Sequence, residues 1–424
     1  MEKLTDYGSE VKRAASRRNM KFNPIINSLL ETDLYKFSMG QAIFHQYSEY
    51  ETNWTFKCRN KDVKFTTEMV EEIKEQIQAF CNLRFTEDEL QYLAGIKWLK
   101  KSYINHLRLW KPDFADFTIE AGGDNGLIIE AEGTWLDTSM YEIPTLAIVN
   151  EVYFRFRDDY DALLKSSKER TRAKADLLRT GVYWLPVFSE FGLRRRLCSE
   201  AQEYAIEQFS NLDNDDILRS YFVGTSNVYL AKKYGVKPVG TMAHEWIMAA
   251  GQGNHLYNPS FGNHVALRSW VQEYGVDNGI ALTDTLTTDC FLRDFDKTLA
   301  TLFSGVRHDS GDPFVWGDKM IDHYTRLGID PATKTLLFSD SLNFEKADKI
   351  ARYFQGKAKV AFGIGTYISN DTYAEPLNIV MKITKCNGQD VAKISDTAGK
   401  GMCKNQEYVD YLQRAIDWRL MHDD

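Results

Sequence analysis

The second half of the chain repeats a short unit, and this repeat limits the possible folds more than any other feature. Short apolar runs each close in a polar or glycine-containing tail, and sequence typical of helices separates them. The runs are Trp184–Gly192, Ser220–Asn227, Val236–His244, Asn278–Thr285, Phe303–Ser310, Thr335–Ser341 and Lys359–Thr366. This strand–loop–helix rhythm indicates parallel βα units. About seven of them predict an α/β fold, either a barrel or a large doubly wound sheet; of the two we expect an irregular (β/α) TIM-like barrel.

The sequence before this repeat mixes helix and strand patterns. The segment Ser28–Tyr50 reads as an amphipathic helix that Thr32 or Asp33 could cap. Further on, a turn-rich loop separates two β-prone runs, as in a hairpin. The other expected elements are a strand at Trp54–Arg59, helices at Val63–Leu83 and Asp88–Asn105, and a long helical region from Ile148 to Thr180.

After residue 370 the pattern returns to antiparallel strands. Asn378–Cys386 and Asp390–Ser395 bracket Asn387-Gly388, a strong short signal for a hairpin. The 424 residues are enough for two or three domains. We therefore expect an α+β domain over residues 1–145, with residues 1–20 as a loose tail. A catalytic α/β barrel over 146–370 would follow, and a C-terminal hairpin and helix over 371–424 would return to the N-terminal domain.

Charge and cysteine content narrow the partners and the compartment. With 52 basic and 60 acidic residues the net charge is −8, so no bulk attraction to nucleic acid is expected. None of the six cysteines forms a CxxC pair, which indicates free thiols in a reducing cytosol. No apolar run approaches the roughly 18 residues of a membrane span, and the N-terminus has no apolar core of a signal peptide. We expect a cytoplasmic protein without a membrane partner.

His244 closes the third apolar run and is followed by helix-like sequence. Histidine can act as base, acid or nucleophile near neutral pH, and the carboxyl edge of a parallel sheet is where α/β folds present reactive groups. A solitary histidine is more often a satisfied structural residue. The catalytic interpretation therefore depends on partners elsewhere in the chain.

Several other strand ends carry charge. Arg194 and Arg195, with Arg196, directly follow the first run; a solvated charge run is one interpretation, and an anion site that uses arginine's bidentate geometry is the other. Arg307 and Asp309 follow the fifth run and could hold a phosphate and a ribose diol. The segment Ser310–Pro313 reads as a turn before a helix.

The remaining strand ends offer carboxylates and glycines. Asp284 and Asp340 could accept bonds from sugar hydroxyls or help hold Mg²⁺, or they could cap the following helices. Gly363, Gly365 and Thr366 form the last βα loop, a place where barrels often bind phosphate. Together these residues predict a phosphate-bearing sugar substrate, a small anionic partner near the arginines, and a histidine between them.

With these motifs in hand, the chain closely resembles the nicotinate phosphoribosyltransferases of the bacterial and yeast type. The resemblance runs in family order over all but the first twenty or so residues. It is carried by Thr32–Lys36, Phe191–Arg196, Phe222–Asn227, Gly240–Trp246, Leu282–Thr285, Arg307–Pro313, Phe338–Asp340 and Phe362–Thr366. It implies that nicotinate and 5-phosphoribosyl 1-diphosphate give nicotinate mononucleotide and diphosphate in NAD biosynthesis, with Mg²⁺ as cofactor.

The resemblance also implies an ATP-coupled ligase in which ATP phosphorylates His244 and hydrolysis of the phosphohistidine drives product formation. Asp309 and Asp284 would be catalytic with His244. Tyr35 and Phe191 would stack on nicotinate, with Tyr35 supplied by a neighbouring subunit in a homodimer. Arg194, Arg195, Thr225 and Ser226 would complete the nicotinate site. Arg307, Asp340, Gly363, Gly365 and Thr366 would bind phosphoribosyl diphosphate.

Two other functions stay open. Nicotinamide phosphoribosyltransferases resemble the chain at the phenylalanine–glycine motif but carry an aspartate where Ser226 stands. Because an aspartate bonds an amide and repels a carboxylate, the neutral Ser226 favours the acid. A catalytically silent, nucleotide-binding regulator is the other alternative, and the intact His244, Arg307, Asp309 and Asp340 speak against it.

Overall fold

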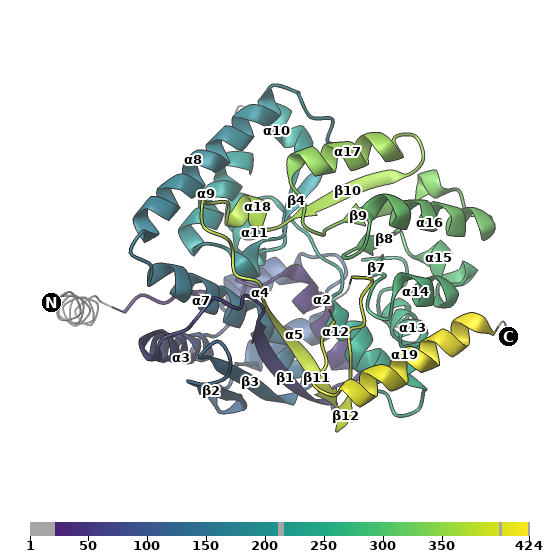
Figure 1. Cartoon of the computed structure of the whole chain (residues 1–424), viewed down its shortest axis with the longest axis horizontal. Helices are drawn as coiled ribbons and strands as arrows, with labels where there is room; N and C mark the ends of the chain where they lie inside the picture. The colour runs from purple at the N-terminus through teal and green to yellow at the C-terminus, as the bar shows by residue number, and fades with distance from the viewer. Residues whose placement is uncertain (1–21, 211–215, 398–400, 423–424) are drawn as a thin grey trace.

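The computed structural model describes residues 22–210, 216–397 and 401–422. Its centre is a curled parallel sheet of seven strands in the order β6-β5-β4-β10-β9-β8-β7 (Figure 1). Each predicted apolar run contributes one strand: β4 (Phe188–Glu190), β5 (Phe222–Thr225), β6 (Lys237–Pro238), β7 (Ile280–Leu282), β8 (Gly305–His308), β9 (Thr335–Phe338) and β10 (Lys359–Ile364). Among the described residues β6 and β7 do not pair with each other, so the barrel stays open on one side. The predicted irregular α/β barrel is confirmed.

Helices follow the strands and cover the outside of this sheet (Figure 1). Side-chain caps start several of them next to the strand ends. Asp312 accepts hydrogen bonds from the N–H groups of Phe314 and Val315 and so caps α16, which confirms the predicted turn. Asn227, Thr287 and Asn343 cap α11, α14 and α17. The helices are α9 (Ser199–Ser210), α10 (Asp216–Tyr221), α11 (Val228–Tyr234), α13 (Gly262–Tyr274), α14 (Thr288–Asp294), α15 (Lys297–Leu302), α16 (Pro313–Arg326), α17 (Phe344–Phe354) and α18 (Thr366–Ser369).

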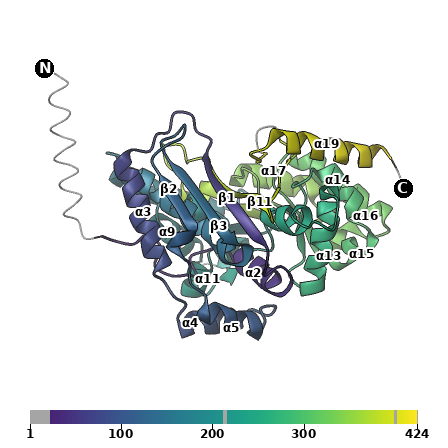
Figure 2. The same ribbon diagram turned by 90° about the horizontal axis from the view of Figure 1, so that it is seen from below.

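A second, antiparallel sheet joins the two ends of the chain (Figure 2). Its order is β12-β11-β1-β3-β2, with β1 (Glu51–Cys58), β2 (Phe117–Glu120), β3 (Ile128–Thr134), β11 (Ile379–Cys386) and β12 (Gln389–Asp390). Strand β11 pairs with β1 from Thr52↔Cys386 to Cys58↔Ile379. Asn387 and Gly388 have φ of 51° and 74°, as a tight hairpin turn requires. The C-terminal segment therefore adds a strand to the N-terminal sheet, while the predicted domain boundaries stay predictions.

Helix α2 (Leu34–Gln46) differs from the prediction in two respects. Asp33 occupies the N-cap position but makes no capping bond; its carboxylate instead accepts a hydrogen bond from Ser226 Oγ at 2.6 Å. Every residue from Leu34 to Ile43 is buried, so all but the last turn of the helix is enclosed on all sides. The prediction of a capped amphipathic helix is wrong because α2 is packed between the barrel and the antiparallel part.

The predicted helical regions after α2 are divided more finely than expected. The region Asp88–Asn105 holds α4 (Glu87–Ala94) and the start of α5 (Lys101–Leu109), and Ile148–Thr180 lies across α7 (Glu142–Arg155) and α8 (Tyr160–Arg179). The remaining helices are α3 (Thr67–Cys81), α6 (Trp135–Thr138), α12 (His244–Trp246) and α19 (Gln406–Met421), with 3₁₀ turns η1 (Phe114–Asp116), η2 (Ser139–Tyr141), η3 (Leu193–Arg195), η5 (Pro259–Phe261) and η6 (Pro331–Thr333).

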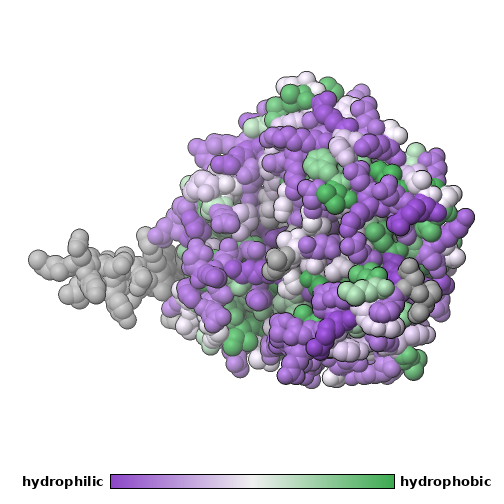
Figure 3. All heavy atoms as spheres, turned by 45° about the vertical axis from the view of Figure 1, so that its right-hand side comes forward, coloured by the Kyte–Doolittle hydropathy of each residue, from purple (hydrophilic) through white to green (hydrophobic). Residues whose placement is uncertain are grey.

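No helix in the described ranges combines the length and apolar character needed to cross a bilayer. On the face in Figure 3 hydrophilic side chains predominate, and apolar residues form small separate groups.

Large aromatic side chains form the core between the two sheets. Trp246 lies 5.6 Å from Trp135 and 5.3 Å from Trp270, measured between ring centroids. Tyr47 packs edge-on against Trp246 at 5.7 Å. These residues come from the N-terminal region and from the barrel, so both parts share one core directly behind His244.

We expect Ile379→Ala to lower the free energy of unfolding by about 2–5 kcal/mol. Ile379 is 1% exposed in β11, and its truncation leaves a cavity between the two ends of the chain. Denaturant titration measures the loss. Lys385→Ala, on the exposed side of the same strand, is the matched control and should stay within about 0.5 kcal/mol of the unchanged protein. Equal effects of the two changes would contradict the role given to this pairing.

Candidate active site

A cavity of about 880 Å³ lies at the carboxyl ends of the barrel strands. Its walls come from the barrel, the N-terminal region and the C-terminal return. Most predicted site residues line it: Tyr35, Phe191, Arg194, Arg195, Ser226, His244, Arg307, Asp309, Asp340, Gly365 and Thr366. Thr225, Asp284 and Gly363 lie behind this wall, where they support the lining residues.

His244 follows β6 and begins α12, which continues into the π-helix η4 (Ile247–Gln252). Its Nε2 lies 2.9 Å from Asp284 Oδ1, and the residue is 5% exposed. Burial and then the positive charge of Lys393 lower the pKa of His244 to about 4, against the opposing effect of Asp284. The neutral ring therefore donates its Nε2 proton to Asp284 and keeps a lone pair on Nδ1. Within the described part of the chain no protein atom hydrogen-bonds Nδ1, which favours the catalytic over the structural interpretation.

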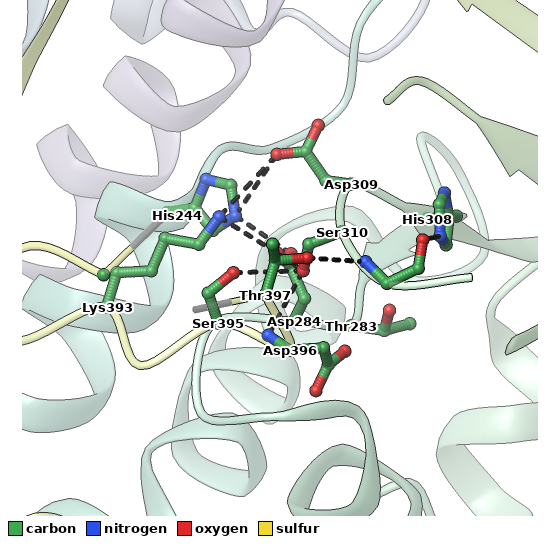
Figure 4. A network of polar contacts seen from close by, with 12 residues as sticks. His244, Thr283, Asp284, His308, Asp309, Ser310, Lys393, Ser395, Asp396 and Thr397 are labelled. Atoms are coloured by element: carbon green, nitrogen blue, oxygen red, sulfur yellow. Dashed lines mark hydrogen bonds and ion pairs between the residues drawn. The ribbon is translucent and has the colours of Figure 1, made fainter. Parts of the chain in front are cut away.

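Asp284 is the hub of the polar network drawn in Figure 4. Ser310 Oγ donates to its Oδ2 at 2.6 Å, and Lys393 Nζ lies 2.9 Å from the same oxygen. Burial alone would raise the pKa of Asp284, but His244 and Lys393 outweigh it and hold that pKa well below its usual range. Asp284 caps no helix, because Thr287 caps α14. The carboxylate therefore orients His244.

Asp309 faces the same histidine from the loop that directly follows β8. Its Oδ2 lies 3.6 Å from His244 Nε2 and 3.8 Å from Lys393 Nζ, and its Oδ1 accepts from Ser339 Oγ at 3.1 Å. Arg307 lies 3.4 Å from that oxygen. Burial favours the neutral acid, but Arg307 and Lys393 outweigh it and lower the pKa of Asp309. The carboxylate is ionised, and 19% of its side chain is exposed at the cavity.

The arginine run has three different environments. Arg196 is buried and pairs with Glu31 at 3.0 Å and Glu151 at 3.6 Å, so it supports the fold. Arg194 lines the cavity 4.0 Å from Glu142. Arg195 also lines it, and no carboxylate in the described ranges forms an ion pair with it. Burial and then Arg194 lower the pKa of Arg195 to about 10, so the guanidinium stays charged at neutral pH. The cavity therefore contains a cation suited to a ligand anion.

The hydroxyls of Thr225 and Ser226 are turned toward buried carboxylates. Thr225 Oγ donates to Glu190 and Ser226 Oγ to Asp33, each at 2.6 Å. Burial raises the pKa of Glu190 to about 7 despite its three hydrogen-bond donors. Ser226 therefore reaches the cavity with its hydroxyl proton already engaged, and Thr225 lies behind it.

Close packing explains the glycine at position 363. A Cβ there would lie 2.3 Å from Phe191 Cδ2, so a side chain would displace the phenylalanine ring. Gly365 and Thr366 line the cavity at the start of α18. Asp340 lines it beyond β9 and, like Asp284, caps no helix, because Asn343 caps α17.

Sequence reasoning missed the charged residues from the two ends of the chain. Arg59, Lys382 and Lys393 line the cavity. Burial lowers the pKa of Lys382 to about 8, although Glu142 opposes this. The one local signal was a lysine inside an apolar run, Val391-Ala392-Lys393-Ile394. Lys36 was also missed; it is fully buried between Glu142, at 2.8 Å, and Glu245.

Two groups of side chains were tested as metal ligands. His244, Asp284 and Asp309 present ligand atoms within 4.8 Å of one another, but the Lys393 ammonium already contacts both carboxylates. A divalent cation there would be repelled. Asp309 and Asp340 follow neighbouring strands and offer oxygen donors at the cavity, the chemistry that Mg²⁺ prefers.

The fold and this cavity define an α/β-barrel protein with a cavity lined by both acidic and basic side chains at the carboxyl edge of its sheet. The model of the nicotinate phosphoribosyltransferase (NAPRTase) family matches residues 187–419, and the model of its N-terminal domain matches residues 30–150. The chain belongs to the nicotinate phosphoribosyltransferase family.

Curated relatives and a solved structure agree with this assignment. A nicotinate phosphoribosyltransferase of Chromobacterium violaceum is 43% identical over 403 residues, covering 93% of this chain and 98% of the relative. One of Acinetobacter baylyi is 44% identical over 407 residues, covering 94% and 98%. The crystal structure of the Porphyromonas gingivalis nicotinate phosphoribosyltransferase superposes with a TM-score of 0.83 at 36% identity, covering 93% of this chain and 100% of that chain.

We expect His244 to stay neutral as the pH falls from 8 to about 5, because burial and Lys393 disfavour its charged form. NMR titration of labelled histidine should show its protonation only near pH 4, with His244→Gln identifying the signal. An inflection between pH 6 and 7 would contradict this account of the site.

Proposed function

We propose that this enzyme transfers the phosphoribosyl group of 5-phosphoribosyl 1-diphosphate to nicotinate, giving nicotinate mononucleotide and diphosphate for NAD biosynthesis. One observation carries the proposal. In a chain of this family, a neutral histidine, two ionised carboxylates and a guanidinium without an ion-pair partner in the described residues meet at one cavity.

Positioning and charge would supply the catalysis. The pyridine nitrogen lone pair attacks the anomeric carbon while the bond from that carbon to the diphosphate oxygen breaks. The transition state resembles an oxocarbenium ion, so a fixed carboxylate nearby favours it. Asp309 is suited to this role because Arg307 and Ser339 hold it ionised and in place. Asp284 acts on His244 from behind the wall.

Cations and aromatic rings would orient the two substrates. Phe191, Tyr35, Arg194 and Arg195 all line the cavity. The two rings would stack on the pyridine ring, and the two arginines would supply charge for the nicotinate carboxylate. The phosphoribosyl diphosphate would be held by Arg307, Asp340, Gly365 and Thr366. Gly363 has no side chain and so leaves room for the Phe191 ring. Thr225 and Ser226 would act by shaping this pocket, because their hydroxyl protons are engaged by carboxylates.

Asp309 and Asp340 would hold Mg²⁺ together with substrate oxygens. When bound, the ion neutralises negative charge that develops on the departing diphosphate. Lys382 and Arg59 lie on the same cavity wall and add positive charge from the antiparallel sheet.

His244 would couple the transfer to ATP. Its Nδ1 lone pair attacks the γ-phosphorus, the bond to the β-phosphate oxygen breaks, and ADP leaves with that electron pair. Asp284 accepts the Nε2 hydrogen bond and stabilises the positive ring that results. Water then hydrolyses the phosphohistidine. The enzyme is proposed to work in the cytoplasm.

Oligomeric state is a separate part of the proposal. Tyr35 and Phe191 both line the cavity of a single chain. A homodimer in which Tyr35 is shared across an interface stays a prediction.

An assay of the purified chain with nicotinate and nicotinamide side by side tests the proposed activity. We expect mononucleotide formation from nicotinate and at least ~100-fold lower kcat/KM for nicotinamide, because the pyridine pocket offers guanidinium groups to a carboxylate. ATP should increase product yield from nicotinate. Preference for nicotinamide would make the chain the other kind of phosphoribosyltransferase, and no turnover of either would favour the silent regulator.

His244→Ala should abolish ATP-dependent labelling of the enzyme while slow ATP-independent transfer remains. The imidazole carries the phosphoryl group in this mechanism but does not touch the reacting anomeric carbon. Labelling with γ-³²P-ATP and product assays without ATP measure the two effects. Phosphate that still attaches covalently to the variant would refute the assignment.

A further inference from the structure

A short C-terminal segment, Lys393–Thr397, crosses the catalytic face of the barrel and is here called the strap. Ile394 N–H donates to Thr285 O at 2.8 Å, and Thr397 Oγ accepts from Gly311 N–H at 3.0 Å. Asp396 accepts from Thr288 N–H at 2.8 Å. The strap is thus bonded to the loops after β7 and β8, the two strands that precede Asp284 and Asp309.

Ser310 links the strap to the hydrogen bonds of Asp284. Its Oγ accepts from Ser395 Oγ at 3.0 Å and from Asp396 N–H at 3.2 Å, and donates to Asp284 Oδ2. Ser395 has a φ of 71°, a strained value for a residue other than glycine. The strap therefore keeps one specific and costly conformation at this point.

This conformation brings Lys393 into the catalytic cluster. Its side chain is 5% exposed, and its ammonium lies 2.9 Å from Asp284 and 3.8 Å from Asp309 (Figure 4). A buried ammonium loses most of its hydration, and a hydrophobic side chain of similar size is often at least as stable in such a place. Fold stability alone thus gives no reason for a charge here.

The proposed phosphoryl transfer supplies that reason. Before transfer the neutral His244, two aspartates, Arg307 and Lys393 carry no net charge. Phosphorylation of the ring adds two negative charges on the phosphoryl oxygens and one positive charge on the ring, so the net charge falls by one. This charge lies beside the carboxylates of Asp284 and Asp309, whose oxygens are 2.9 and 3.6 Å from Nε2. Without Lys393 the same group would enter a cluster that is already negative, in a buried site where like charges repel strongly.

We propose that Lys393 is the counter-ion that lets His244 carry a phosphoryl group between Asp284 and Asp309, and that the strap holds it there. This inference rests on the proposed ATP-coupled function. It assigns the strap a role in energy coupling, whereas the proposed phosphoribosyl transfer relies chiefly on Arg194, Arg195, Arg307 and Asp309.

The test compares three variants of the full-length enzyme: Lys393→Met, Lys393→Gln and Lys393→Arg. With γ-³²P-ATP, Lys393→Met and Lys393→Gln should each lower the amount of trapped phosphohistidine and shorten its half-life at least about tenfold, because either change removes the charge. The glutamine of Lys393→Gln can still hydrogen-bond Asp284, so a loss of label in this variant cannot result from an Asp284 oxygen left without a partner. Lys393→Arg keeps the positive charge and should retain most of the label. ATP-independent transfer, measured on the same preparations, should fall at least about threefold less than the label does in Lys393→Met and Lys393→Gln.

Lys385→Met is the matched control, since this lysine is exposed on β11; it should label as the unchanged enzyme does. Wild-type labelling of Lys393→Gln would overturn the inference, as would an equal fall of labelling and ATP-independent transfer in Lys393→Arg. His244→Ala separates the two proposals. If that variant is not labelled while Lys393→Met and Lys393→Gln are labelled normally, only the counter-ion role fails.

Discussion

A buried lysine, Lys36, holds together the parts of the chain that build the site. It comes from α2 and contacts Glu142 of α7 and Glu245 of α12. Trp135 Nε1 and Ser139 Oγ donate to the other oxygen of Glu245, at 3.2 and 2.6 Å. Loss of one partner from such a buried group costs about 3–5 kcal/mol, because a charge is then left without compensation. Glu245 is the neighbour of His244, and Glu142 faces Arg194. The same buried charges therefore set the position of the histidine and of the arginine.

The antiparallel sheet brings residues from both ends of the chain to one cavity. The pairing of β11 with β1 puts Lys382 opposite Thr55, so that Lys382 and Arg59, which follows β1, both line the cavity; the chain then continues through β12 to Lys393. A barrel whose strands close completely would leave less room for this return. The open side of the parallel sheet is thus compatible with a site that the C-terminal segment completes.

The strands and strand-end residues could be predicted because their signals are local. Each of the seven apolar runs contains one strand of the parallel sheet. Because the strands are parallel, the polar residues that follow them all lie at the carboxyl edge of that sheet. Asp33 was misread because its partner, Ser226, is distant in sequence, and a local cap was the only partner that the pattern offered. Arg196 looks like Arg194 and Arg195 in the sequence, yet Glu31 and Glu151 bind it within the core. Lys36, Lys382 and Lys393 depend on pairing between remote segments, and no local periodicity records such contacts.

The shared cluster would let one cavity serve both proposed reactions without separate sites. Asp309 lies 3.6 Å from His244, yet its other oxygen is held by Ser339 and lies near Arg307. In the proposed mechanism the carboxylate would serve the ribose on one side, while the histidine is oriented independently by Asp284. A phosphoryl group on His244 would change the electrostatic potential at Asp309, because at this separation a buried charge is only partly screened. In the proposed mechanism, charge delivered by ATP would thus influence how tightly the cavity holds anionic ligands, with no large movement of the chain required.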